Sequence, residues 1–246
     1  MIFITGDLHG HVDKSKLNTQ SFPQQKELTK NDFVIIAGDF GGIWDESRSE
    51  NWLLRWLEKK RFTTLFVDGN HENFDLLNQY PVTTWNGGKV HEIRPGILHL
   101  MRGQVFQIEG MKFFTFGGAD SIDKHYRKEG VSWWPQERPT EEEFAEGMKN
   151  LEKHSYSVDY VITHTAPQEI VAQLGYLRED GKFIDPTTTM LSRFQEKINF
   201  KHWYFGHFHE DTTLEKYTAL YYKLKCLKQY NTLKNSPPTS GGLRIT

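Results

Sequence analysis

The sequence lacks the features of a disulfide-linked, membrane-spanning or strongly charged protein. Cys226 is the only cysteine among 246 residues, which excludes a disulfide within the chain and a cluster of thiolate metal ligands. No apolar run is long enough to cross a bilayer. The formal net charge is −2, so the composition gives no reason to expect general binding to nucleic acid or to membranes. What remains is an ordinary globular composition with the length of one large domain.

The N-terminus also lacks a targeting segment. Residues 1–5 already form a short apolar, β-branched run, with no charged region or cleavage site before it. We therefore expect the protein in the cytoplasm. A basic run at residues 59–61 closes a predicted helix, where cations oppose the negative end of the helix dipole. We interpret that run as structural.

The first part of the chain alternates between strands and helices. Residues 1–5, 32–37 and 64–67 are apolar runs typical of buried strands, and residues 50–61 carry apolar side chains at helical spacing. This alternation favours a parallel sheet covered by helices. Short apolar segments separated by Gly-containing turns follow, and they predict an antiparallel meander over residues 90–92, 97–101, 105–108 and 111–116.

The rest of the chain returns to mixed structure. Residues 140–153 predict a helix with acids in its first turn, residues 158–163 and 202–205 predict buried strands, and a helix is expected near residues 191–198. The sequence thus predicts one α/β domain over residues 1–225 and a C-terminal extension over 226–246, to which we assign no role. Residues 217–227 alternate as in an edge strand, and residues 235–242 (NSPPTSGG) are linker-like.

Metal-binding residue types follow five of the predicted strands. Asp7 and His9 come after the first strand, and side chains two residues apart in an extended segment point the same way. In open α/β sheets, ligands bind beyond the carboxyl ends of the strands. We therefore predict a metal centre at this edge. In chain order, the candidate residues are Asp7, His9, Asp39, Asn70, His71, His164, His207 and His209.

Each motif taken alone has an ordinary structural explanation. Asp7 and His9 alone would more often be a turn or a surface pair, and His164 alone a hydrogen-bonded structural histidine. For the pair His207 and His209 alone, a metal site and a structural role are equally frequent interpretations. Because the structural explanation needs several coincidences in the right order, we prefer the metal. The remaining histidines lack such partners and are interpreted as structural: His11, His91, His99, His125, His154 and His202.

The ordered motifs GDLHG, GDFGG, GNHE, THT and GHFH resemble those of the calcineurin-like metallophosphoesterase superfamily, over residues 7–209. The resemblance implies a four-layer α/β/β/α sandwich with two mixed β-sheets. It also implies a metal-dependent phosphoric ester hydrolase with two divalent transition-metal ions. Manganese is the first choice, and iron, zinc, cobalt or nickel are alternatives, since the ligands are oxygen and imidazole.

The resemblance implies a role for each candidate residue. One metal would have the terminal ligands Asp7, His9 and His209. The other would have the terminal ligands Asn70, His164 and His207. Asp39 would bridge both metals, because a bridging ligand needs two donor oxygens. His71 resembles the catalytic histidine of the family, close to the metals without binding them; Asp45 and Asp120 are the candidates for an acid that orients it.

The substrate stays open at this level. Protein phosphatases and dinucleoside-tetraphosphate hydrolases of the family usually carry Asp-Arg-Gly after the second-strand aspartate, whereas Gly41 and Gly42 stand here. That departure and the GHFH ending favour hydrolysis of a phosphodiester or a nucleotide phosphoanhydride by attack of a metal-bridging hydroxide. The alternatives are a phosphomonoesterase, including an activity like that of Ser/Thr protein phosphatases, then a nuclease, then a non-enzymatic scaffold. The nuclease is disfavoured because basic stripes are lacking.

Residues 117–140 form a long connection, and long connections in compact domains are often functional. Arg127 within it is a candidate substrate-binding residue, since a guanidinium can hold phosphate bidentately; a surface ion pair is about equally frequent. We interpret Trp133 and Trp134 as an anchor on the core rather than as a platform for a base. The expected partner is a small phosphate ester or nucleotide; neither a membrane nor nucleic acid is expected, and the sequence does not predict the oligomeric state.

Overall fold

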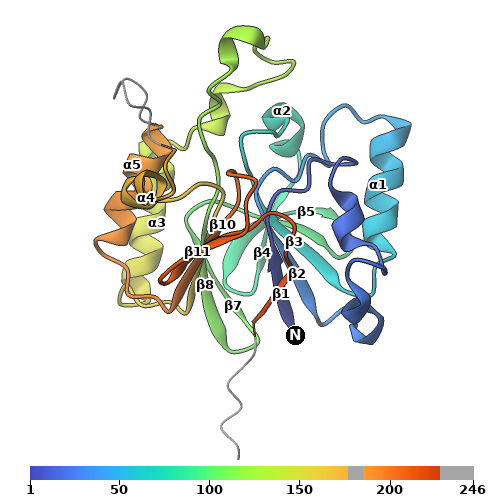
Figure 1. The fold of residues 1–246 in the computed structure, drawn as a ribbon, viewed down its shortest axis with the longest axis horizontal. Helices are drawn as coiled ribbons and strands as arrows, with labels where there is room; N and C mark the ends of the chain where they lie inside the picture. Colours follow the sequence, from blue (N-terminus) through green and yellow to red (C-terminus); the bar gives the residue numbers. More distant parts are fainter. Residues whose placement is uncertain (177–184, 228–246) are drawn as a thin grey trace, which may run out of the picture.

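The computed structural model describes residues 1–176 and 185–227. Two mixed β-sheets occupy its centre, and helices cover their outer sides (Figure 1). The layers therefore follow the order α/β/β/α, and the fold predicted from the sequence motifs is confirmed. Within the described residues, no helix is long and apolar enough to span a bilayer.

The larger sheet contains seven strands: β1 (Ile2–Thr5), β2 (Phe33–Ala37), β3 (Thr63–Val67), β4 (Val82–Trp85), β5 (Gly88–Arg94), β6 (Ile97–Leu100) and β13 (Lys225–Leu227). Their order across the sheet is β13-β1-β2-β3-β6-β5-β4. The central strands β1, β2, β3 and β6 run parallel, whereas β13 and β5 pair antiparallel on either side of them. Parallel strands buried on both faces explain why β1, β2 and β3 consist of apolar and β-branched residues.

The smaller sheet contains six strands: β7 (Gln104–Ile108), β8 (Met111–Phe116), β9 (Tyr160–Thr163), β10 (His202–Phe205), β11 (Thr212–Leu214) and β12 (Tyr217–Ala219). Their order is β11-β12-β10-β9-β8-β7. Strands β8, β9, β10 and β12 run parallel, and β7 and β11 are antiparallel edges. Each sheet thus has a parallel centre with antiparallel strands at its margins.

The helices are α1 (Arg48–Glu58), α2 (Phe74–Leu77), α3 (Glu141–Lys153), α4 (Gln168–Gln173) and α5 (Pro186–Gln195). In the part of the chain that the structure describes, four short 3₁₀ helices accompany them: η1 (Lys14–Leu17), η2 (Pro23–Glu27), η3 (Lys124–Tyr126) and η4 (Pro135–Glu137). The start of α3 is defined by a capping box between Thr140 and Glu143, and the Ser47 side chain accepts a hydrogen bond from the first turn of α1. These caps define the first residues of α1 and α3 after long connections from β2 and β8.

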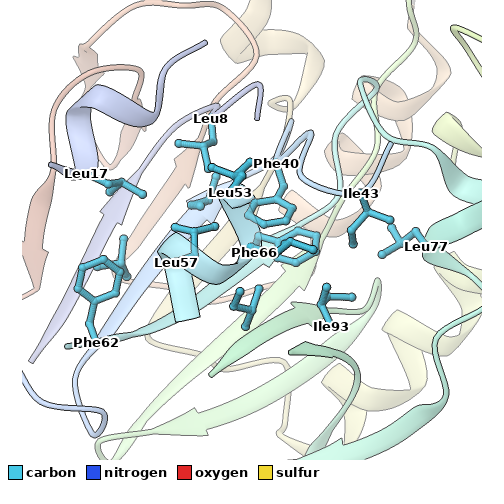
Figure 2. Packing of buried hydrophobic residues seen from close by; sticks show 14 of the residues in the cluster. Leu8, Leu17, Phe40, Ile43, Leu53, Leu57, Phe62, Phe66, Leu77 and Ile93 are labelled. Atoms are coloured by element: carbon cyan, nitrogen blue, oxygen red, sulfur yellow. The ribbon is translucent and has the colours of Figure 1, made fainter. Parts of the chain in front are cut away.

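Three clusters of buried apolar side chains fill the interfaces between the layers. The first packs Leu53 of α1 near Phe66 of β3 on the outer face of the larger sheet (Figure 2). The second includes Phe194 of α5 and covers the outer face of the smaller sheet. The third joins Ile4 of β1 and Phe113 of β8, which belong to different sheets. The sheets therefore pack directly on each other, and this contact fixes the relative position of their strand ends.

The strands predicted as one antiparallel meander are divided between the two sheets, so that pairing prediction was wrong. β5 and β6 form a hairpin of the larger sheet, and β7 and β8 form a hairpin of the smaller one. The chain changes sheets between β6 and β7, where Gly103 has φ +70° and a Cβ atom would come within 2.9 Å of the Gly147 backbone in α3. The prediction recognised the hairpins but not the crossing.

The C-terminal strand prediction is likewise divided. Within residues 217–227, β12 lies inside the smaller sheet and β13 forms an edge of the larger one. The domain boundary predicted after residue 225 falls inside β13, whose Cys226 pairs with Phe3 of β1. Residues 226 and 227 therefore belong to the sheet. The remainder of the predicted extension, including the linker-like residues 235–242, lies outside the described residues.

Candidate metal centre

The predicted metal ligands lie in the loops that follow β1, β2, β3, β9 and β10. Because the two sheets pack face to face, loops from both of them meet at one edge (Figure 1). Asp39 follows β2 in the larger sheet, and His164 follows β9 in the smaller one. His164 Nε2 lies 3.3 Å from Asp39 Oδ1, so the centre spans both sheets.

A first group of potential ligands consists of Asp7, His9 and His209, whose ligand atoms all lie within 4.8 Å of one another. His209 Nε2 is 3.0 Å from Asp7 Oδ2. Asp7 is fully buried, and its Oδ2 accepts no hydrogen bond of normal geometry from the described residues. A buried carboxylate oxygen left in this state beside two imidazoles fits a cation site. This group has the composition that the family resemblance implied.

A second group consists of Asp7, Asp39 and His164, again with ligand atoms within 4.8 Å of one another. The resemblance instead implied Asn70 and His207 beside His164. Both are close: His164 Nε2 lies 3.0 Å from Asn70 Oδ1 and 3.2 Å from His207 Nδ1. Oxygen or nitrogen atoms of Asn70, His207 and Asp39 thus all lie within 3.3 Å of His164 Nε2, and Asp7 belongs to the same group.

Asp39 lies between the two groups. Its Oδ2 is 3.3 Å from His9 Nε2, and its Oδ1 is 3.3 Å from His164 Nε2. One oxygen faces each group, as a bridging ligand requires. Asp39 adopts a left-handed conformation with φ +44°, and a Cβ atom at position 69 would come within 2.1 Å of Asp39 Oδ1. The glycine of GNHE therefore makes room for this carboxylate.

The buried carboxylates attract positive charge. Burial opposes ionisation of Asp39, but the charge of His164 and its hydrogen bond hold the Asp39 pKa well below its usual range. Burial likewise opposes charge on His164, yet Asp39 raises the pKa of that imidazole to about 10. Burial and the neighbouring His164 lower the pKa of His207 to about 4. Burial opposes charge on His9 too, yet Asp39 raises the pKa of His9 to about 9. Among the protein groups alone, two imidazoliums therefore balance the carboxylates; divalent ions with oxygen and imidazole ligands fit the same place.

His71 lies beside this cluster. Its backbone N–H donates to Asp39 Oδ1 over 2.7 Å, and its ring stands edge-on to that of His9 with 5.6 Å between centroids. The ring nitrogens Nδ1 and Nε2 are 3.3 and 3.1 Å from Nη1 and Nη2 of Arg127. Burial lowers the pKa of His71, and the positive charge of Arg127 adds to the lowering against the attraction of Asp39.

The two acids considered as orienting partners of His71 have other partners. Asp45 accepts from the backbone N–H of Ser47 near the start of α1. Asp120 is paired with Lys124 and Arg138. His71 contacts a guanidinium instead, so the prediction of an orienting carboxylate at Asp45 or Asp120 was wrong. The contact arises because the 117–140 connection returns over the site.

A cavity of about 380 Å³ opens on the cluster of candidate metal ligands. Its polar side includes Asn70, His71 and Arg127, and its other side includes Phe208 and Tyr176, whose ring centroids are 4.7 Å apart. This volume suits a small molecule or a nucleotide. Arg127 also pairs with Asp123, with 2.8 Å between Nη2 and Oδ2. Arg127 thus carries an ion pair and also lines the cavity; its binding of substrate stays a prediction.

The 117–140 connection projects beyond the two sheets and bends back at its tip (Figure 1). Trp134 fastens it to the body: the side chain is 3% exposed, its Nε1 donates to Asp75 Oδ2 over 2.8 Å, and its ring stands edge-on to Trp44. The anchor predicted for this loop is therefore confirmed at Trp134. Trp133 is only half-buried, with Lys124 Nζ 5.0 Å from its ring centroid.

Two polar side chains that the sequence did not point to support ligands of the centre. Ser121 Oγ accepts from Asn70 Nδ2 over 3.0 Å, which leaves Asn70 Oδ1 facing His164. Glu72 is buried and accepts from the backbone N–H groups of Phe40 and Gly41, so it holds the loop after β2. Glu72 is the last letter of the GNHE motif, and its position there was the available signal. Ser121 offered no comparable signal, because its contact depends on the course of a long loop.

Asp13 is the third side chain of this kind. Its Oδ2 lies 2.7 Å from His9 Nδ1, and its Oδ1 accepts from the Tyr221 hydroxyl over 3.1 Å. A carboxylate on one imidazole nitrogen fixes the ring and directs the other nitrogen toward a metal. Asp13 is buried, which strengthens the contact.

We expect Asp13→Ala to lower the affinity for metal by about 10- to 100-fold, the usual effect of removing such a partner. Titration of the metal against a chelating dye measures the change. Asp159→Ala serves as the control, because Asp159 pairs with Lys201 just before β9, at the opposite end from the cluster. Equal affinities for the Asp13→Ala variant and the parent protein would contradict the role of Asp13.

Comparisons with known proteins agree with this geometry. The sequence model of the family described as calcineurin-like phosphoesterase matches residues 1–211. A lariat debranching enzyme of Danio rerio is 23% identical over 237 residues, which cover 85% of this chain and 40% of that protein. Lariat debranching enzyme A of Xenopus laevis is 29% identical over 143 residues, or 52% of this chain and 25% of its own length. The chain thus spans about two fifths or less of the length of these relatives.

Proposed function

Because this chain belongs to the calcineurin-like phosphoesterase family, we propose that it is a dinuclear metal-dependent hydrolase of a phosphodiester or a nucleotide phosphoanhydride. The observation that carries the proposal is the convergence of oxygen and imidazole ligands around Asp39, beside a cavity that contains His71. Relatives named for the debranching of lariats support a diester substrate over a phosphoprotein.

We assign the ligands as the family resemblance implied. One ion would be held by Asp7, His9 and His209. The other would be held by Asn70, His164 and His207, and Asp39 would bridge the two. When bound, two such ions supply Lewis-acid polarisation of the phosphoryl group and activation of water. Manganese is the first candidate, with iron, zinc, cobalt and nickel as alternatives, and the ion present in a cell depends on metal supply.

His71 and Arg127 are the protein groups that would act on the substrate. Arg127 faces both ring nitrogens of His71, so a phosphate entering between them meets a guanidinium on one side and an imidazole on the other. The negative charge of a bound phosphate raises the pKa of an adjacent imidazole. His71 would then hold a proton that it can pass to the leaving oxygen.

A phosphomonoesterase is the second candidate, and one observation favours it. A monoester dianion carries more negative charge than a diester, so it needs more positive charge around it. Arg127 of the 117–140 connection lies where it could provide that charge. That arginine would replace the one missing after Asp39.

We expect kcat/KM in the presence of Mn²⁺ to be higher for bis-p-nitrophenyl phosphate or a dinucleoside polyphosphate than for p-nitrophenyl phosphate or a phosphopeptide. Preference for the phosphopeptide would overturn the proposed substrate class. If the simple monoester is preferred, Arg127→Ala should lower its kcat/KM by about tenfold or more, the loss of one charged contact. Lys128→Ala, which removes the next, exposed cation of the same loop, is the matched control.

A further inference from the structure

A stripe of aromatic and cationic side chains begins next to the metal cluster and is not used by the hydrolytic site. It consists of His11, Lys14, Trp52, Trp56 and Lys60, and we call it the aromatic stripe. The rings of His11 and Trp52 are stacked with 5.7 Å between centroids and 28° between planes. Those of Trp52 and Trp56 are stacked with 6.4 Å and 12°. Three nearly parallel rings thus follow one another.

The stripe combines residues of different structural importance. Trp56 is only half-buried and packs against the core cluster beneath α1, which explains its presence there. Trp52 is 51% exposed and lies one helical turn earlier on α1. Trp52 is ordered by stacking on His11 and Trp56. Because half of its side chain is exposed, the core does not require an aromatic residue at this position. Its exposed surface is available to a ligand.

Cations lie over these rings. Lys14 Nζ is 4.4 Å from the centroid of Trp52 and 3.0 Å from His11 Nδ1. Lys60 Nζ is 3.7 Å from the centroid of Trp56. On α1 itself, Arg48 and Arg55 are exposed within about one helical turn of Trp52 on either side. Arg48 and Arg55 flank Trp52 through helical spacing, whereas the fold brings Lys14 to it from η1.

The position of the stripe connects it to the site of hydrolysis. His11 follows the proposed ligand His9 by two residues, so their Cα atoms are at most about 7.6 Å apart. The backbone is fixed there: Gly10 N–H donates to Phe40 O over 2.9 Å, and His11 Nε2 lies 2.8 Å from Ser49 O. The stripe therefore leads from the metal cluster onto the outer face of α1, which Figure 1 shows at the side of the larger sheet.

We propose that the aromatic stripe binds a single-stranded nucleic acid next to the phosphate that is cleaved. This inference rests on the proposed phosphodiesterase function and names its substrate class. Proteins that bind single strands combine cations that follow the backbone with aromatic rings on which bases stack. Stacking of a base on an indole is stronger than an exposed cation–π contact. A base can therefore displace the Lys14 ammonium from Trp52, and the freed ammonium can meet a phosphate.

Binding of a single strand to the aromatic stripe differs from what we expect of the composition and charge of the chain. Nucleic acid was not expected, because the chain is slightly acidic and contains no long basic run. The short run at residues 59–61 was interpreted as structural, and Lys60 does bond to backbone and side-chain oxygens of Leu17 and Gln25. A basic surface nevertheless arises around Trp52 from η1 and α1 together.

Binding of a fluorescein-labelled single-stranded oligonucleotide tests the stripe. Fluorescence anisotropy is measured with an RNA and a DNA probe in a His71→Ala background, so that the metals are retained and the probe stays intact. We expect Trp52→Ala to raise Kd about tenfold, the loss of one stacked base, and Trp52→Phe to restore most of the affinity. Lys14→Ala should reduce the slope of log Kd against log salt by about 0.7, the loss of one phosphate contact. Lys201→Ala, which removes an exposed lysine before β10, should leave both quantities unchanged.

A second measurement separates this inference from the proposed function. With His71 intact, Trp52→Ala should keep the parent kcat/KM for bis-p-nitrophenyl phosphate, because Trp52 does not line the cavity. Failure of the parent protein to hydrolyse that diester would overturn the function itself. Hydrolysis of the diester together with equal Kd values for the parent, Trp52→Ala and Trp52→Phe would overturn only the stripe. Absence of oligonucleotide binding, or equal affinity for a duplex of the same sequence, would overturn it too, since stacking needs unpaired bases.

Discussion

The Asp39→Asn variant is expected to lose metal at both positions at once and to lose hydrolysis with it. The two carboxylate oxygens of Asp39 face different groups, with His9 Nε2 and His164 Nε2 each 3.3 Å away. An amide keeps one donor oxygen and presents an NH₂ group to the other ion. We expect kcat/KM to fall by about three orders of magnitude or more, which corresponds to several kcal/mol of transition-state stabilisation.

Elemental analysis after loading with Mn²⁺ and desalting measures this result directly. The parent protein should retain two equivalents per chain and the variant clearly less than one. Asparagine tolerates the left-handed conformation of Asp39, so the backbone itself gives no reason for misfolding. Asp120→Asn is the matched control, because Asp120 lines the same cavity but is paired with Lys124 and Arg138. One equivalent or none in the parent protein would contradict the dinuclear centre.

The second large effect is expected at His71. His71→Ala should keep both metals and lower kcat by about two orders of magnitude or more, the scale of general acid–base catalysis. The side chain lines the cavity, while the contact between His71 and Asp39 is made by the backbone N–H, which alanine retains. Removal of the imidazole therefore leaves the hydrogen bond to the proposed bridging ligand intact.

Steady-state kinetics and metal analysis of the same preparation separate the two possible roles of His71. Loss of a metal together with activity would show that the imidazole is a ligand. An unchanged kcat would show that it is structural. His125→Ala provides the comparison, because His125 is an exposed histidine on the 117–140 connection whose ring contacts Tyr126. That substitution should change neither quantity.

The candidate ligands could be predicted because each of them directly follows a strand. Residue type and distance from the strand end are local properties, and parallel strands bring such positions to one edge. Asp7 and Asp39 meet for this reason, whereas His164 follows β9 of the smaller sheet and joins them because the two sheets pack on each other. Asp13 and Ser121 could not be predicted in the same way. Asp13 is in a loop without periodicity, and Ser121 reaches Asn70 across 51 residues.

The strand pairing, too, is predictable from the sequence in part and depends on the tertiary structure for the rest. The hairpins β5–β6 and β7–β8 depend on short turns with glycine, so the sequence indicated them. Their assignment to different sheets depends on β6 pairing with β3 and on β8 pairing with β9. Those pairings depend on which buried strand surfaces pack against each other, and no local sequence pattern predicts them.

The sequence by itself determined which residues can bind metal, which strands precede them and the family fold, because residue type, apolar runs and motif order are written along the chain. Only the tertiary structure decided that Asp7 approaches both ligand groups, that Arg127 lies against His71 across 56 residues, and that the aromatic stripe forms one surface. Even the hydrogen bond from the His207 N–H to Asp7 spans 200 residues. Such contacts depend on how the two sheets and the long connection pack, and packing is a property of the whole chain.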